Sequence, residues 1–237
     1  MHKPIATKAI LRSFLTVALL VLLVAITNRA YAEAKNLAVL GSSTAAGTGA
    51  SQVSRSWVGL LQTWLSKTKG ESIINLATPG ILSTSALCTL QVNSNLSELI
   101  APTRSVDRAL KLGATRFILA FPSNDTTNGM SAEQTISNFL DMRQCAQSND
   151  KAQVAVMSSL PRDGLTKQQN ATIAQIDAAM RKEFGSCFIN VRSALADNDH
   201  ESIRPDLSAG DGVHFNNAGH AIIFDIVKRF MESGKCF

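Results

Sequence analysis

The residues of this chain that could carry out chemistry together lie near its two ends. Asp211 and His214 stand three positions apart in Asp-Gly-Val-His, and Ser43 lies far upstream in Leu-Gly-Ser-Ser-Thr-Ala-Ala-Gly, directly after a short apolar run. A serine hydroxyl is a poor nucleophile until a neighbouring base removes its proton. Histidine can act as that base, and a carboxylate beside it holds the imidazole in the required tautomer. The pattern predicts one reactive site built from segments distant in sequence.

Each of these segments also has a simpler interpretation. Serine and threonine often cap the first turn of a helix, so Ser43, Ser42 or Thr44 could be capping residues. An Asp-Gly turn followed by histidine could likewise cap the last helix. The two further histidines of the C-terminal part, His200 and His220, are expected to be solvated or satisfied surface residues.

The first 32 residues have the pattern of a secretory signal peptide. Three basic residues precede or border an uncharged apolar run over 14–26, and Ala30-Tyr31-Ala32 is a small-x-small cleavage site. The run is shorter than the roughly 20 residues that span a bilayer, which favours cleavage after Ala32. The sequence therefore predicts a secreted or periplasmic protein, with residues 33–237 forming one domain. A retained N-terminal anchor is the alternative.

Removal of this leader would change the charge of the protein. The whole chain carries a formal net charge of +5. Four of its basic residues and none of its acidic ones lie in residues 1–32, so the predicted mature chain carries +1. No basic patch with interleaved aromatic residues is left to bind nucleic acid. We expect no nucleic-acid partner and no stable membrane insertion after cleavage.

Four cysteines lie in the predicted mature chain: Cys88, Cys145, Cys187 and Cys236. An even number in an exported protein favours two disulfides, and four cysteines allow three pairings. We favour Cys187 with Cys236, because they flank the last strand–helix unit, which leaves Cys88 with Cys145. The alternative is four reduced cysteines, two or more of them buried. No Cys-x-x-Cys or Cys/His spacing indicates a metal site.

Short apolar runs alternate along the chain with longer segments of helical periodicity. Strands buried on both faces are expected at 36–40, 72–76, 116–120, 153–157 and 187–191. Helices are expected at 56–69, 106–112, 131–147, 167–183 and 218–231. This alternation predicts an α/β fold with a mostly parallel sheet between two helical layers, and functional loops at the carboxyl ends of the strands. Residues 84–105 fit neither pattern, and we expect them to cover a sheet edge or form one wall of the site.

Four separated blocks of this sequence resemble the SGNH (GDSL-type) serine hydrolases. They are Gly41-Ser-Ser-Thr44, Asn75-Leu-Ala-Thr-Pro-Gly80, Pro122-Ser-Asn-Asp125 and Asp211-Gly-Val-His214. Any one block occurs readily by chance, but four in the family's order, at predicted strand ends or in the last loop, are much more specific. The resemblance covers nearly the whole mature chain and implies a flavodoxin-like three-layer α/β/α sandwich with a five-stranded sheet.

The resemblance implies a role for one or two residues of each block. Ser43 aligns with the nucleophile, His214 with the base and Asp211 with the residue that orients it. The negative oxygen formed by attack on an ester would be held by the backbone N–H groups of Ser43 and Gly80 and by the side-chain amide of Asn124. Gly80 lets the main chain approach a substrate, and Asn124 is a neutral donor. No metal, nucleotide or organic cofactor is implied.

Three positions depart from the family's usual residues. Ser42 stands where the family usually has aspartate. The loss of that carboxylate is expected to change the contacts that support the serine loop and to leave proton transfer intact. Pro122 stands in place of glycine and lacks an N–H, so we expect a slightly different placement of the loop that carries Asn124. Phe215, where proline is frequent, could line the acyl or leaving-group pocket or be a buried residue at a helix start.

Together these features predict an exported serine esterase that acts as a monomer. Small generic esters, lipid acyl esters or thioesters, and acetylated glycans are the substrate classes considered. An aromatic content of only 5% offers no obvious sugar-stacking platform, which slightly disfavours glycans. Ser42 and Pro122 motivate an alternative, a non-catalytic binding protein on the same fold. An acyltransferase that uses the same three residues is a further alternative.

Overall fold

The computed structural model describes residues 36–88, 103–150 and 152–237. The compact unit described below begins at Lys35. The predicted leader, its cleavage site and most of the unassigned segment 84–105 lie outside the described residues.

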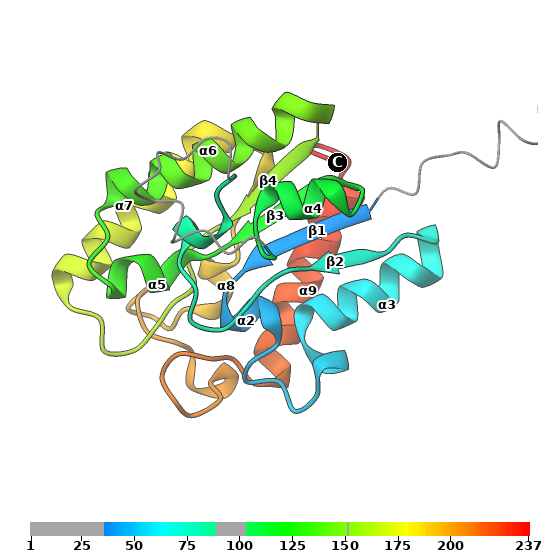
Figure 1. Ribbon diagram of the computed structural model, residues 1–237. Coiled ribbons are helices and arrows are strands. Elements are labelled where there is room, and N and C mark those ends of the chain that lie inside the picture. The colour runs from blue at the N-terminus through cyan, green and yellow to red at the C-terminus, as the bar shows by residue number, and fades with distance from the viewer. Residues whose placement is uncertain (1–35, 89–102, 151) are drawn as a thin grey trace, which may run out of the picture. The chain divides into compact units, whose positions relative to one another are not determined.

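Five parallel strands form the sheet of this unit (Figure 1). They are β1 (Asn36–Gly41), β2 (Ile73–Asn75), β3 (Ala114–Ala120), β4 (Gln153–Met157) and β5 (Phe188–Ile189), in the order β2-β1-β3-β4-β5. The predicted fold class is therefore confirmed. The outer strands β2 and β5 are shorter than predicted. The inner strands are buried on both faces, which is why their sequences are almost continuously apolar.

Five helices agree with the predicted ones to within a few residues. They are α3 (Trp57–Lys69), α4 (Val106–Lys111), α6 (Ala132–Asp150), α7 (Lys167–Phe184) and α9 (Asn217–Glu232). Three short helices were not predicted: α2 (Ser43–Ala46), α5 (Pro122–Thr127) and α8 (Arg192–Leu195). Four residues, as in α2 and α8, are too few to show helical periodicity, and the polar sequence of α5 has no apolar stripe. The 3-10 turns are η1 (Val53–Arg55), η2 (Ser83–Ala86), η5 (Gly185–Cys187) and η6 (Pro205–Leu207).

Helices cover both faces of the sheet (Figure 1). Side chains alternate between the faces along each strand. In β1, Leu37 and Val39 pack in a cluster with α3 and α9, whereas Ala38 and Leu40 pack in a second cluster with α4, α6 and α7. Full burial of an aliphatic side chain contributes about 1.5–3 kcal/mol, so these two layers account for most of the apolar stabilisation.

Two disulfides join distant parts of the unit. Cys88, just after η2, is bonded to Cys145 of α6, and Cys187, just before β5, is bonded to Cys236 near the C-terminus. These are the pairings that the sequence analysis favoured. The second bond attaches the end of the chain to the outer strand of the sheet.

We predict that replacing both Cys187 and Cys236 by serine lowers the free energy of unfolding. The bond closes a loop of 49 residues, and the loss of such a constraint on the unfolded chain corresponds to about 4 kcal/mol. Urea denaturation of the oxidised wild type and the variant would measure the difference. An unchanged midpoint would show that these two sulfurs are not bonded in the folded protein.

Candidate active site

Ser43 lies where β1 passes into the short helix α2. Gly41 ends the strand, and a Cβ there would meet the carbonyl oxygen of Ala120 at 2.6 Å, so the serine turn requires glycine at this point. Ser43 is the first residue of α2, and only 9% of it is exposed. Ser42 occupies the N-cap position, but its side chain makes no capping hydrogen bond. The capping interpretation therefore does not apply to Ser43.

The loop before α9 presents a carboxylate and an imidazole together. Asp211 Oδ1 accepts the backbone N–H groups of Val213 and His214 at 2.9 and 2.8 Å. Its Oδ2 lies 2.6 Å from His214 Nδ1. On the other side of the ring, His214 Nε2 lies 2.8 Å from Ser43 Oγ. The structure thus brings the three predicted side chains into one continuous hydrogen-bonded line.

The electrostatics of this line determine where the protons lie. The side-chain hydrogen bond from His214, and then its backbone N–H, hold the pKa of Asp211 well below its usual range. The carboxylate therefore accepts from Nδ1–H, which leaves Nε2 of a neutral ring to accept the Ser43 hydroxyl proton. Because its folded-state pKa is depressed, Asp211 keeps its charge as the pH falls through the range in which ordinary aspartates become protonated.

Gly80 and Asn124 follow the two strands that flank β1. Gly80 has φ +80, a conformation that favours glycine, and a Cβ there would meet no protein atom within 4 Å. Asn124 lies in the first turn of α5, directly after β3, and its Nδ2 donates to the carbonyl of Ile81 at 3.3 Å. The two predicted donor segments are therefore in direct contact at the carboxyl edge of the sheet.

The unusual residues of the family motifs fit the local structure. Pro122 is at the start of α5, where a helix needs no N–H from its first residue. The N–H of Ser42 donates to Ala120 O at 3.3 Å and so continues the pairing of β1 with β3. Phe215 is fully buried and packs in the α3–α9 cluster, so it is a core residue at a helix start and does not line a pocket.

His220 contradicts the expectation of a surface histidine, whereas His200 is exposed as expected. His220 is fully buried, and its Nδ1 accepts the Trp57 N–H at 3.3 Å while Nε2 donates to Thr48 O at 3.1 Å. Burial lowers the pKa of His220 and favours the neutral ring that both bonds require. Thr48 in turn donates its N–H to Ser43 O at 2.9 Å, so His220 supports the serine loop from behind.

Two further residues that the sequence analysis did not single out support the histidine loop. Asp163 donates its N–H to Gly212 O at 2.8 Å and accepts the N–H of Ile203 at the same distance. Gly49 has φ +93 and lies so close to the loop that a Cβ would overlap Phe215 O and come within 3.0 Å of His214 Cβ. No motif signals these contacts, because each depends on two loops meeting.

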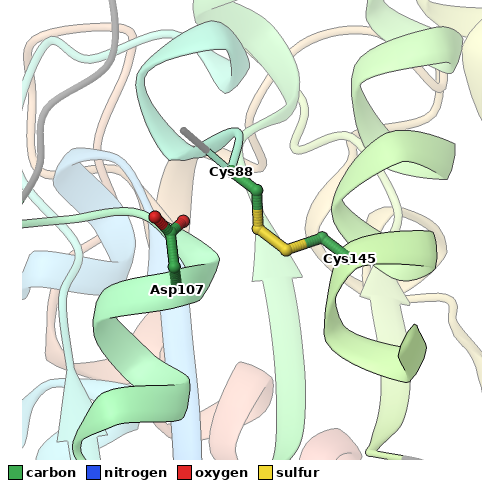
Figure 2. A group of neighbouring side chains, drawn as sticks. All are labelled: Cys88, Asp107 and Cys145. Carbon is green, nitrogen blue, oxygen red and sulfur yellow. A yellow bond between two sulfur atoms is a disulfide. The ribbon is translucent and has the colours of Figure 1, made fainter. Parts of the chain in front are cut away.

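One group among the described residues could by position hold a metal ion. Cys88, Asp107 and Cys145 have ligand atoms within 4.8 Å of one another. Figure 2 shows that the two sulfurs are bonded to each other beside the carboxylate of α4. A sulfur in a disulfide is not the thiolate that binds a metal, so this group is a disulfide with a neighbouring acid.

The chain is similar to proteins of a known family. The sequence profile of the GDSL-like lipase/acylhydrolase family matches residues 39–222. The chain belongs to this family. No match was found among curated proteins. Within the part of this GDSL-like chain that the structure describes, no helix is long and apolar enough to cross a membrane.

Solved structures share the fold at low sequence identity. The structure of TesA has a TM-score of 0.66 and 17% identity, covering 84% of this chain and 99% of its own. The psychrotrophic esterase EstA from Pseudoalteromonas sp. has a TM-score of 0.62 and 18% identity, covering 84% and 98%. A two-domain esterase active on acetylated mannans has a TM-score of 0.59 and 18% identity, covering 90% of this chain and 54% of its own.

Substitution of Gly49 by alanine should disturb the histidine loop more than it disturbs the fold. The methyl group would displace Phe215 O and His214, so ester hydrolysis should fall by about 10²-fold, as expected for a misplacement of roughly 1 Å. The far-downfield proton NMR signal of His214 Nδ1–H should shift or broaden.

Gly129→Ala is the matched control. Gly129 also has a positive φ, +79, but a Cβ there would meet nothing within 4 Å. The left-handed backbone should cost each variant about 1–2 kcal/mol of stability. Gly49→Ala should lose further stability through the clash with Phe215 O, and only Gly49→Ala should lose activity. Equal activity in the two variants would remove Gly49 from the support of the site.

Proposed function

We propose that this protein is a serine esterase that hydrolyses carboxylic esters through an acyl-enzyme on Ser43. The observation that carries the proposal is the unbroken contact of Ser43 Oγ with His214 Nε2 at 2.8 Å and of His214 Nδ1 with Asp211 Oδ2 at 2.6 Å. Membership of the GDSL-like lipase/acylhydrolase family supports the same chemistry.

In the first half-reaction, Ser43 Oγ attacks the ester carbonyl carbon as His214 Nε2 takes the hydroxyl proton. The bond from that carbon to the leaving oxygen then breaks, and His214 returns the proton to the departing alcohol. In the second half-reaction, His214 Nε2 takes a proton from a water molecule, whose oxygen attacks the acyl carbon. The bond from this carbon to Ser43 Oγ then breaks, the carboxylic acid leaves, and His214 returns the proton to Ser43. Asp211 stays a carboxylate throughout and stabilises the imidazolium that forms twice.

The negative oxygen of each tetrahedral intermediate needs donors already in place. The N–H of Ser43 lies in the first turn of α2, where backbone N–H groups have no partner within the helix. We assign the other two donors to the N–H of Gly80 and the side-chain amide of Asn124, which lie after strands on either side of β1. Loss of one such donor typically costs about 3–4 kcal/mol of transition-state stabilisation.

We further propose that the protein is exported and loses residues 1–32. The two disulfides support this, because such bonds persist in oxidising compartments. Small carboxylic esters are the proposed substrate class. The similar structures include an esterase and an esterase active on acetylated mannans, and the acetyl group of the latter's substrate is a short acyl group.

Labelling with a fluorophosphonate probe tests the nucleophile. The wild type should be modified at Ser43, and Ser43→Ala should be unlabelled and inactive with nearly unchanged melting temperature, because a small loop serine contributes little packing. A series of acyl esters of increasing chain length would then locate the acyl limit. Folded wild-type protein that fails to react at Ser43 would favour a non-catalytic binding protein on the same fold.

Substitution of Asp211 by asparagine tests the second contact. The amide would present an N–H to Nδ1 and favour the wrong tautomer, so kcat should fall by about 10² to 10⁴-fold with little change in KM. Asp206→Asn, in the same connection between β5 and α9 but paired with Arg204, is the matched control and should keep its activity. A rate in Asp211→Asn equal to that of the control would exclude Asp211 from the catalytic line.

A further inference from the structure

The segment that carries Gly80 is only loosely attached to the sheet. After β2 ends at Asn75, Leu76 N donates to Val39 O and Thr78 N to Gly41 O, both within β1. Beyond Thr78 the chain turns through Gly80 and reaches η2 without a further bond of this kind among the described residues. The position of the Gly80 N–H must therefore depend on contacts that come from outside the sheet.

Asp125 supplies one of these contacts. It lies on α5 beside Asn124, is fully buried, and accepts the N–H of Ser83 through Oδ1 at 2.9 Å. Asn124 at the same time donates to Ile81 O at 3.3 Å. Two adjacent residues of one helix thus hold both ends of the three-residue stretch that follows Gly80.

Helix α6 holds the same segment from a second side. Asn138 Nδ2 donates to Ser83 Oγ at 2.7 Å, and Gln134 Nε2 donates to Asn138 Oδ1 at 3.0 Å. A few residues further on, Cys88 is bonded to Cys145 of the same helix (Figure 2). Asn138 and Ser83 are both buried, so the hydrogen bond between these two side chains is not weakened by water.

Burial of a carboxyl group such as that of Asp125 is energetically unfavourable, because it removes the group from water. Burial raises the pKa of Asp125, and hydrogen bonds from Ser83 act against that rise. No ion pair with Asp125 is present among the described residues. Asp125 also has no place in the proton transfers assigned above. An apolar side chain of similar size could fill the space without the cost of desolvation.

We propose that Asp125 is a positioning residue for the oxyanion hole. By accepting the Ser83 N–H while Asn124 binds Ile81, it sets the main chain at Gly80 relative to the Asn124 amide, so that the two donors converge on one oxygen. The inference rests on the proposed function, because it assumes that both groups bind the oxyanion. It assigns Asp125 the role of a hydrogen-bond acceptor whose charge is not required.

Two substitutions of Asp125 test this assignment. Asp125→Ala removes the acceptor, and kcat for a short activated ester should fall about 10 to 100-fold at nearly constant KM, because the Gly80 donor is displaced. Asp125→Asn keeps an oxygen that can accept the Ser83 N–H and should restore kcat close to the wild-type value. Both rates are measured on protein shown to be folded by circular dichroism.

Glu71→Ala is the control for a simple loss of stability. Glu71 forms a largely buried ion pair with Arg116 at 2.6 Å, and it precedes β2 at the opposite, amino edge of the sheet. Its removal should lower the melting temperature and leave kcat unchanged. A kcat loss in Glu71→Ala comparable with that in Asp125→Ala would show a general stability effect and overturn the proposal.

Ser83 provides a second test that does not depend on the folding of Asp125→Ala. Ser83→Pro removes the N–H that Asp125 accepts, at the first residue of η2, where proline is tolerated and the preceding Leu82 is already extended (φ −97, ψ 166). Ser83→Ala loses only the hydroxyl. The proline variant should have a kcat about tenfold or more below that of the alanine variant.

Several outcomes would contradict the inference. These are wild-type kcat in Asp125→Ala, equal kcat in Ser83→Pro and Ser83→Ala, or a loss in Asp125→Asn as large as in Asp125→Ala. Failure of the proposed function is a separate result, because wild-type protein would then hydrolyse no ester and remain unlabelled at Ser43.

Discussion

The hydrogen bond between His214 Nε2 and Ser43 Oγ joins residues 171 positions apart, and the arrangement of the whole unit serves to make it. A parallel sheet brings this about because it directs every strand's carboxyl end to one edge. Ser43 follows β1, the second strand of the sheet, and the strands on either side, β2 and β3, lead into Gly80 and Asn124. The last connection, before α9, then returns His214 to the same place.

The strand ends alone do not hold the reactive groups in register. Short polar contacts between loops do so, and most of them use backbone groups. His220 binds Thr48, which binds Ser43; Asp163 binds the glycine beside Asp211; Gly49 packs directly on the histidine loop. Apart from the local bond between Thr48 and Ser43, each of these contacts joins segments from different parts of the chain. The burial of His220 is explained by this requirement.

The local backbone structure explains why two departures from the usual family residues are tolerated. Pro122 begins a helix, where its missing N–H would have had no partner inside the helix. Ser42 keeps the backbone bond that extends β1 along β3, and its side chain plays no part in capping α2. Neither residue breaks the line from Ser43 to Asp211, so the case for a non-catalytic protein loses the features that motivated it.

Periodicity along the sequence was sufficient to predict the fold class, the five strands and the long helices, because a sheet buried on both faces requires continuous apolar runs and its covering helices require an apolar stripe. Motif spacing singled out Ser43, Asp211 and His214. It could not show that His220 and Phe215 are buried or that Asp125 holds Ser83, since a residue's type does not reveal which loop will pack against it. Those properties arose only when the tertiary structure brought distant backbone groups within hydrogen-bonding distance.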